Sequence, residues 1–333
     1  MAGIVHGKSL MVTGAGGFIG SHLVERLVRE GGLVTAFLHY NSRASMGNLV
    51  HLSPKVMQSI KVVHGDVQDY GSVLAAMDGC EVVFHLAALI GIPYSYAAPR
   101  SYVATNVGGT LNVLEAARSL GGVRVVHTST SEVYGTALTV PIDEGHPLQA
   151  QSPYSASKMA ADKLAESYHL SFGLPVVTVR PFNTYGPRQS GRAVIPTIIG
   201  QLLGGNGDVC LGSLAPMRDF NYVCDTVDAF VLAGISDDAI GRVVNAGSGK
   251  SISIGDLAYK IISLLGTGGK VVQGNDRRRP KGSEVMNLVC DNSLAADLLC
   301  WHPQTSLADG LQRTIRFFGD HPEALRNPME YGV

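Results

Sequence analysis

Residues 10–23 read LMVTGAGGFIGSHL, and this stretch decides the fold. Residues 10–13 form a short apolar run typical of a buried strand, and a helical pattern follows at 19–29. Three glycines between them suit a sharp turn, a close approach of backbone N–H groups to a pyrophosphate, and tight helix–strand packing. The helix N-terminus also favours an anion. A purely structural turn is the alternative, but the position at the first strand–helix junction favours a dinucleotide cradle. Its residues are Gly14, Gly17, Phe18, Ile19 and Gly20.

Short apolar runs alternate with helical patterns along the following chain. The predicted strands are 34–38, 61–64, 82–86, 123–128 and 176–180, and the predicted helices are 70–77, 106–120 and 155–172. This alternation indicates βαβ units, and hence an α/β fold with a Rossmann-type, doubly wound parallel sheet. After residue 180 the alternation fades. We therefore expect residues 1–180 to form the dinucleotide-binding domain and 181–333 mainly a smaller α/β substrate-binding domain, with 219–247 returning to the first.

Composition excludes several classes of protein. The chain has 333 residues, 45% of them hydrophobic, which suffices for a large core. The formal net charge of −1 gives no basic excess for nucleic acid or an anionic membrane. No apolar run reaches the roughly 18 residues of a membrane helix, and the N-terminus lacks signal-peptide features. Five scattered cysteines without a CxxC pair predict reduced, mostly buried thiols and a cytoplasmic location, and no metal-ligand spacing is present.

The region after the second predicted strand bears on the choice of cofactor. It reads FLHYNSR and contains no acid to hold an adenosine ribose. Asn41, Ser42 and Arg43 suit a 2′-phosphate instead, although Arg43 is equally interpreted as a solvated loop residue. NAD and NADP therefore both stay open. Asp66, after the third strand, is placed to accept a hydrogen bond from the adenine amino group; its alternative role is a helix N-cap.

Tyr154 and Lys158 form the candidate catalytic pair. They lie in PYSASK at the start of a predicted helix, and their i, i+4 spacing puts them on one face. The ammonium of Lys158, together with the positive charge of a nicotinamide, favours the phenolate of Tyr154 and allows it to act as a base. A strand ending in hydroxyl side chains, 128–131, precedes the pair.

These motifs, in this order, resemble the extended short-chain dehydrogenases/reductases, specifically the NAD-dependent epimerase/dehydratase family. The resemblance runs from residue 13 to 285 through TGAGGFIGSHL, HGDV, FHLAA, TSTSEVYG, SPYSASK, RPFNTYGP, RDFNYVCD and RRRPKGSEV. It implies an NAD-dependent enzyme with a nucleotide-sugar substrate between two domains, and a homodimer joined through two helices of each subunit. It also implies that Thr130, Tyr154 and Lys158 carry out oxidation at C4 of the sugar. Further cofactor-site residues implied by it are Val67, Leu86, Ala87, Ala88, Asn106, Thr128 and Pro181.

Glu132, in the stretch TSTSEVYG, discriminates between the reactions of this family. A 4-ketone makes the C5 hydrogen acidic, and a carboxylate beside C5 suits a 4,6-dehydratase, which is a lyase. The dTDP-glucose dehydratases have Asp where this chain has Ser131, whereas Thr-Ser-Glu resembles GDP-mannose 4,6-dehydratases and also UDP-glucuronate decarboxylases. The alternatives are therefore a decarboxylase, a 4-epimerase, and a cofactor-sensing binding module without catalysis. Glu132 as a surface acid is the remaining interpretation.

A closer resemblance favours dehydration. The stretches LIGIPYSYAAP, PIDEGHPLQAQSPYSASK and PFNTYGPRQSGRAVIPT resemble bacterial UDP-N-acetylglucosamine (or GDP-N-acetylglucosamine) 4,6-dehydratases of legionaminic-acid-type pathways. This implies sugar contacts from Tyr94, Ser95 and Asn183. It implies diphosphate contacts from Arg192, Arg218 and Arg279. Arg277 and Arg278 are interpreted as a solvated charge run, and His85 and Tyr134 as packed residues.

Overall fold

The large sheet has seven parallel strands in the order β10-β6-β5-β4-β1-β2-β3. The computed structural model describes residues 3–205, 207–274 and 280–325. The order reverses between β1 and β4, which opens a crevice at the carboxyl ends of the strands. The predicted Rossmann-type α/β fold is confirmed. The strands are β1 Ser9–Thr13, β2 Leu33–His39, β3 Ile60–Gly65, β4 Val82–His85, β5 Arg124–Thr128, β6 Val176–Pro181 and β10 Val243–Ala246.

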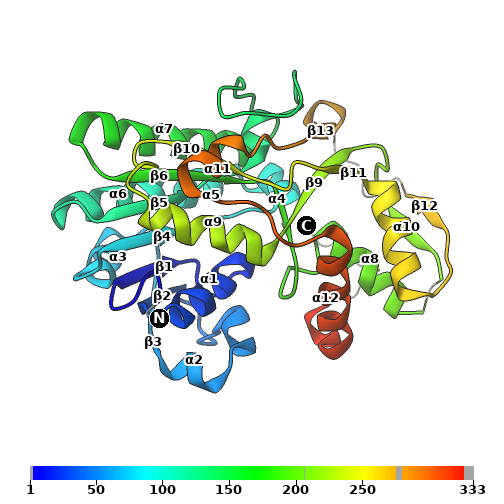
Figure 1. The fold of residues 1–333 in the computed structure, drawn as a ribbon, viewed down its shortest axis with the longest axis horizontal. Helices are drawn as coiled ribbons and strands as arrows, with labels where there is room; N and C mark the ends of the chain where they lie inside the picture. Colours follow the sequence, from blue (N-terminus) through cyan, green and yellow to red (C-terminus); the bar gives the residue numbers. More distant parts are fainter. Residues whose placement is uncertain (1–2, 206, 275–279, 326–333) are drawn as a thin grey trace.

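Helices cover both faces of this sheet because its strands are apolar on both sides (Figure 1). One face packs against α3 (Tyr70–Met77), α6 (Gly109–Ser119) and α7 (Pro153–Phe172). The other packs against α1 (Phe18–Arg29) and α9 (Val223–Ile235).

Short helices connect these layers. They are η1 Gly47–His51, α2 Pro54–Gln58, α4 Ile92–Ala97, α5 Pro99–Tyr102, the π-helix η2 Val103–Gly108 and η3 Ser131–Tyr134. The helix predicted at 106–120 therefore begins earlier, since α5, η2 and α6 follow one another without a break. Pro99 at the first helical position starts the run.

The later part of the chain builds a smaller sheet around β9 (Met217–Tyr222). Strands β7 (Asn183–Tyr185) and β13 (Asn287–Leu288) pair with β9 in parallel, and β11 (Ser251–Ser253) pairs antiparallel. The pair β8–β12 lies near it, and Figure 1 shows α8, α10 and α12 grouped at one end, whereas α11 packs against β10 and α9 of the large sheet. Their bounds are β8 Val209–Leu211, β12 Val271–Gln273, α8 Val194–Leu203, α10 Ile254–Leu265, η4 Lys281–Ser283, α11 Ser293–Leu299, α12 Leu307–Asp320 and η5 Pro322–Ala324. After β9 the chain returns to the large sheet through α9 and β10.

All five cysteines are free, but they are not mostly buried as the sequence predicts. Cys290 is buried and Cys80 is partly buried, whereas Cys210, Cys224 and Cys300 are exposed. Cys210 lies on the outward side of β8, and Cys300 ends α11 in a left-handed conformation. Within the described ranges, no helix is both long and apolar enough to cross a membrane.

The turn between β1 and α1 requires glycine at two positions. Gly14 has a φ of +68°, and a Cβ there would lie 2.8 Å from the backbone nitrogen of Ala87. A Cβ on Gly20 would lie 2.2 Å from the carbonyl oxygen of Gly14. The first glycine lets the turn approach the end of β4, and the second lets α1 approach the turn.

We expect Gly20→Ala to lower the free energy of unfolding by about 1–3 kcal/mol, because the added carbon overlaps a backbone oxygen that cannot move away. Gly319→Ala, in the exposed part of α12, meets no atom within 4 Å and should instead stabilise by about 0.5–1 kcal/mol. Urea unfolding of both variants measures this. A Gly20→Ala variant as stable as the parent would contradict the close packing of α1.

Candidate active site

Helix α7 presents Tyr154 and Lys158 toward the end of β5. Ser152 caps the helix by accepting a hydrogen bond from the backbone of Ser155 at 3.1 Å, so Tyr154 lies in the first turn. The hydroxyl of Tyr154 hydrogen-bonds to the side chain of Thr130. The Nζ of Lys158 donates to the carbonyl oxygen of Thr128 at 2.5 Å. Both side chains are buried.

The segment after β5 brings a carboxylate to the same place. Thr130 caps η3, and its hydroxyl accepts a hydrogen bond from the backbone N–H of Glu132 at 3.2 Å. Glu132 is partly exposed, and its negative charge acts on the phenol of Tyr154. Ser131 between them is buried. The structure therefore brings together the side chains of Thr130, Glu132 and Tyr154, with Lys158 one helical turn further on.

Burial dominates the ionisation of the catalytic pair. It raises the pKa of Tyr154 well above its ordinary value, and the charge of Glu132 raises it further, while the hydrogen bond from Thr130 acts in the opposite direction. Burial also lowers the pKa of Lys158 to about 8, against the opposing effect of Asp162. The phenol of Tyr154 thus keeps its proton in this structure, and the expected phenolate needs further positive charge, such as that of a nicotinamide.

We expect the free energy of unfolding to rise between pH 8 and 10.5 through Lys158. The unfolded chain keeps this proton up to the ordinary pKa of 10.5, whereas the folded chain releases it near pH 8. Between these values the unfolded state binds more protons, so raising the pH favours the folded state, by about 3 kcal/mol over the window. Lys158→Met should lack this gain. Urea unfolding of the parent and of Lys158→Met at pH 8 and pH 10.5 measures this gain as the difference between the two proteins. An equal change in the free energy of unfolding of both proteins would contradict a lowered pKa of Lys158 in the folded state.

The glycine turn faces a backbone segment fixed by two buried polar side chains. The hydroxyl of Thr13 accepts hydrogen bonds from the backbone N–H groups of Leu86 and Ala87, both at 3.1 Å, and Ala88 follows directly. The side chain of Asn106 accepts from the N–H of Leu89 at 2.8 Å and donates to Ser157 at 2.9 Å. Asn106 lies in the π-helix η2, a form of helix that is frequent at functional sites.

These residues fit a dinucleotide. The glycines let β1, the end of β4 and α1 approach one another closely, and α1 directs its N-terminus at the turn, where an anion is favoured. At the carboxyl end of β5, the buried hydroxyl of Thr128 has no hydrogen-bond partner among the described residues, so a polar group of a ligand there would satisfy it. Pro181 ends the neighbouring strand β6.

The residues predicted to contact the adenosine lie in two loops, each held by a side-chain oxygen that accepts hydrogen bonds from nearby backbone N–H groups. The side-chain oxygen of Asn41 accepts from the backbone N–H groups of Arg43 and Ser45, both at 3.1 Å, and the side chains of Ser42 and Arg43 are exposed. Asp66 accepts from the backbone N–H of Gln68 at 2.9 Å. The N-cap of α3 is Asp69, so the interpretation of Asp66 as the N-cap is wrong. Val67 is buried below Asp66 and its carbonyl accepts from Asn112 at 2.9 Å.

The predicted sugar-contacting residues have different surroundings. Tyr94 is 41% exposed, and its ring lies 6.1 Å from that of Tyr102, which in turn lies 6.3 Å from the ring of Tyr154. Ser95 is fully buried and its hydroxyl donates within α4 to Ile92 at 2.6 Å. Asn183 donates weakly to the carbonyl of Asp219 at 3.3 Å. Tyr102 was missed by the sequence analysis, since one tyrosine in a helix gives no signal.

The predicted diphosphate-binding arginines also differ in burial. Arg192 is exposed, and its charge acts on the phenol of Tyr102, whose ring lies next to that of Tyr154. Arg218 is buried on β9 and donates to the carboxylate of Glu284 at 3.2 Å. Glu284 was not predicted. Arg279, with Arg277 and Arg278, lies outside the described residues.

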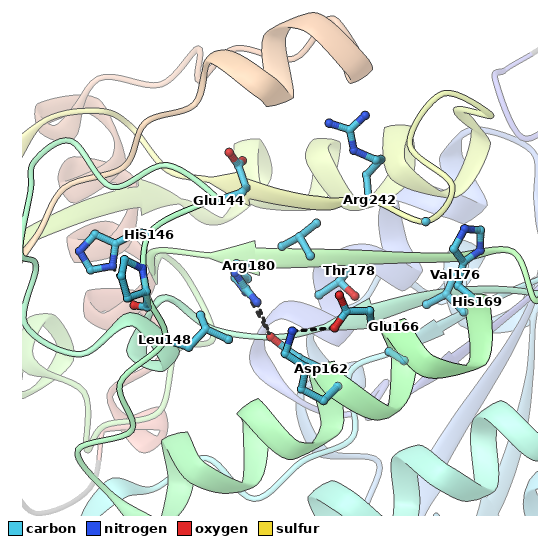
Figure 2. Close-up of a pocket in the computed structure, with 15 residues that line it drawn as sticks. Glu144, His146, Leu148, Asp162, Glu166, His169, Val176, Thr178, Arg180 and Arg242 are labelled. Atoms are coloured by element: carbon cyan, nitrogen blue, oxygen red, sulfur yellow. Dashed lines mark hydrogen bonds and ion pairs between the residues drawn. The ribbon is translucent and has the colours of Figure 1, made fainter. Parts of the chain in front are cut away.

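A separate pocket of about 340 Å³ lies behind the catalytic pair, between α7 and the edge strand β10 (Figure 2). Figure 2 shows Asp162 and Arg180 joined at its base, with Glu144 and Arg242 on the opposite side. Neither Tyr154 nor Lys158 lines it. This pocket is therefore separate from the candidate active site.

Comparison with known proteins agrees with this geometry. A family model described as GDP-mannose 4,6 dehydratase matches residues 11–314. The chain belongs to this family. It is thus an extended short-chain dehydrogenase/reductase of the NAD-dependent epimerase/dehydratase type, a nucleotide-sugar-modifying enzyme.

Relatives of the chain carry out three different reactions. It is 35% identical to a UDP-glucose 4-epimerase of Mycolicibacterium smegmatis, over 92% of this chain and 97% of the relative. It is 33% identical to a UDP-N-acetyl-alpha-D-glucosaminuronate decarboxylase of Bacillus cytotoxicus, over 93% and 98%. A solved structure of DesIV, a dTDP-glucose 4,6-dehydratase from Streptomyces venezuelae with NAD bound, is 31% identical, with a TM-score of 0.85 over 96% and 99% of the two chains. The family activity is therefore dehydration, epimerisation or decarboxylation.

Proposed function

We propose that this enzyme is an NAD-dependent nucleotide-sugar 4,6-dehydratase acting on UDP-N-acetylglucosamine or a related nucleotide hexose. One observation carries the proposal: Thr130, which lies beside the phenol of Tyr154, caps η3 and accepts a hydrogen bond from the backbone N–H of Glu132 at 3.2 Å, so a carboxylate follows directly after the group next to the tyrosine. A base for C4 and a base for C5 then face the same sugar. An epimerase needs only the first.

The chain's own residues divide the chemistry at C4. Tyr154 takes the proton of the C4 hydroxyl, Thr130 hydrogen-bonds to that tyrosine, and Lys158 supplies the nearby positive charge. When bound, NAD would supply the acceptor and the later donor of the hydride that moves from C4 to C6, and its positive charge would favour the phenolate. The residues suited to hold it are those of the glycine turn, the Leu86–Ala88 segment, Asn106 and Thr128.

Glu132 acts at the neighbouring carbon. The 4-ketone acidifies C5, and the carboxylate of Glu132 takes the C5 proton. The C6–O bond breaks, and the leaving hydroxide takes this proton to depart as water. Glu132 then regains a proton, which balances the one that Tyr154 took from the C4 hydroxyl, and returns it to C5 when C6 receives the hydride. Ser131 is a weak acid, so Glu132 is the suitable proton donor to the leaving group. The net change is loss of one water.

The nucleotide and the C2 substituent are proposed from the sequence resemblance to N-acetylglucosamine dehydratases. Arg218 and Arg192 are the described cations suited to a diphosphate, because a guanidinium matches pairs of its oxygens. Tyr94 lies beside Tyr102 and suits a contact with the sugar ring.

Product mass tests the proposal. We expect the enzyme, supplied with NAD, to remove one water from UDP-N-acetylglucosamine or GDP-N-acetylglucosamine without net formation of reduced cofactor. UDP-glucuronate and dTDP-glucose are assayed in parallel. Loss of carbon dioxide from the glucuronate would replace the proposal by the decarboxylase, and an epimer of unchanged mass would replace it by the 4-epimerase.

Glu132→Gln supplies the matching variant. It should bind NAD like the parent but lose dehydration by roughly 10²–10⁴-fold, since the amide cannot take the C5 proton. Glu166→Gln, on the exposed part of α7 beside Lys163, is the control and should retain activity. Parent-like turnover by Glu132→Gln would remove this residue from the role of C5 base.

We propose NAD rather than NADP because the family is NAD-dependent. We expect Arg43→Ala to have small and equal effects on the binding of NAD and NADP, measured by titration. Arg43 is exposed near the end of β2; if it contacted a 2′-phosphate, the variant would weaken NADP binding by roughly tenfold or more and leave NAD binding unchanged. A selective loss of NADP affinity would contradict the choice of NAD.

A further inference from the structure

Asp162 lies one helical turn after Lys158 and is almost completely enclosed. One carboxylate oxygen pairs with His127 Nε2 at 3.1 Å. The other accepts from the hydroxyl of Ser129 at 2.7 Å and from Nε and Nη2 of Arg180 at 3.1 and 3.0 Å. Asp162 on α7 is thereby tied to β5 and β6 at once. The sequence analysis assigned no role to Asp162, His127, Ser129 or Arg180.

Arg180 extends this network to the far side of the candidate C5 base. Its Nη1 donates to the hydroxyl of Tyr134 at 2.9 Å, and its guanidinium lies 5.0 Å from the centre of the Tyr134 ring. The Tyr134 hydroxyl donates onward to Asn245 on β10 at 2.8 Å. Every group in this sequence of contacts is buried.

The two ends of the network bracket the candidate catalytic segment. Ser129 immediately precedes Thr130, and Tyr134 follows Glu132 by two residues. Both are anchored to one ion pair, which lies under the helix that carries Tyr154 and Lys158. The anchors and the catalytic side chains therefore share one rigid support.

We propose that the Asp162–Arg180 pair sets the position of residues 130–132 relative to α7, and that Ser129 and Tyr134 are positioning residues for Thr130 and Glu132. The inference deepens the proposed function, because it concerns the placement of the same two groups. A buried ion pair with its hydrogen bonds satisfied is stiff, whereas loss of one partner leaves an uncompensated charge. A shift of about 1 Å in a reacting group costs on the order of 10²-fold in rate.

Tyr134→Phe and Ser129→Ala test this, because each removes one anchor and leaves the ion pair intact. Tyr185→Phe is the matched control: it also removes a buried tyrosine hydroxyl, which donates to Leu307 at 3.2 Å in the smaller part of the molecule. For each variant, kcat and KM for dehydration and the melting temperature are measured.

We expect both anchor variants to lower kcat by roughly 10- to 100-fold with little change in KM, and Tyr185→Phe to leave kcat unchanged despite a similar fall in melting temperature. Equal kcat for Tyr134→Phe and Tyr185→Phe would overturn the proposal, as would losses of kcat that follow melting temperature across all three. If the parent removes no water from any nucleotide sugar, the proposed function fails separately. In that case kcat of the three variants is compared for the reaction that the parent does carry out, epimerisation or decarboxylation, because these reactions also begin with oxidation at C4 beside Thr130.

Discussion

The buried negative charge of Asp162 is the constraint around which the candidate active site is arranged. A carboxylate removed from water is tolerated only when its oxygens are fully paired, and here serine, histidine and arginine supply the pairing. These partners come from β5 and β6, so the helix that bears the tyrosine–lysine pair has one favourable position on the sheet. The same charge opposes the fall in the pKa of Lys158 that burial causes. The charge of Asp162 thus affects both the position of α7 and the pKa of Lys158.

Burial has a cost that the active-site tyrosine displays. A phenol held away from water and near a carboxylate keeps its proton. The arrangement therefore disfavours a free base in the ligand-free enzyme and leaves activation to the charges that accompany ligand binding. In the proposed mechanism, such dependence couples the chemistry at C4 to occupation of the neighbouring cofactor site.

The sequence predicts those parts of the molecule that rest on local spacing. The glycine turn and the Tyr154–Lys158 pair are each encoded within a dozen residues, and the fold class follows from the alternation of strands and helices. The Asp162 network could not be predicted, because its members are distant in sequence and meet only after the sheet has formed. Strands such as β7 have three residues, too few to display a period. The early start of the helix before α6 was missed because the π-helix breaks the usual spacing around Asn106.

The return of the chain to the large sheet has a mechanical consequence. The backbone passes between the large and small sheets after β6, after β9 and after β10, and later α11 packs against β10 and α9 before α12 packs against β9 and α8. Two bodies joined by a single linker can swing freely, but several separate crossings remove most rotations and leave only small displacements. Replacing the smaller part with that of a relative by gene recombination would likewise need more than one recombination point, because its segments are not contiguous in the sequence. The two parts are therefore expected to evolve together and not as independent modules.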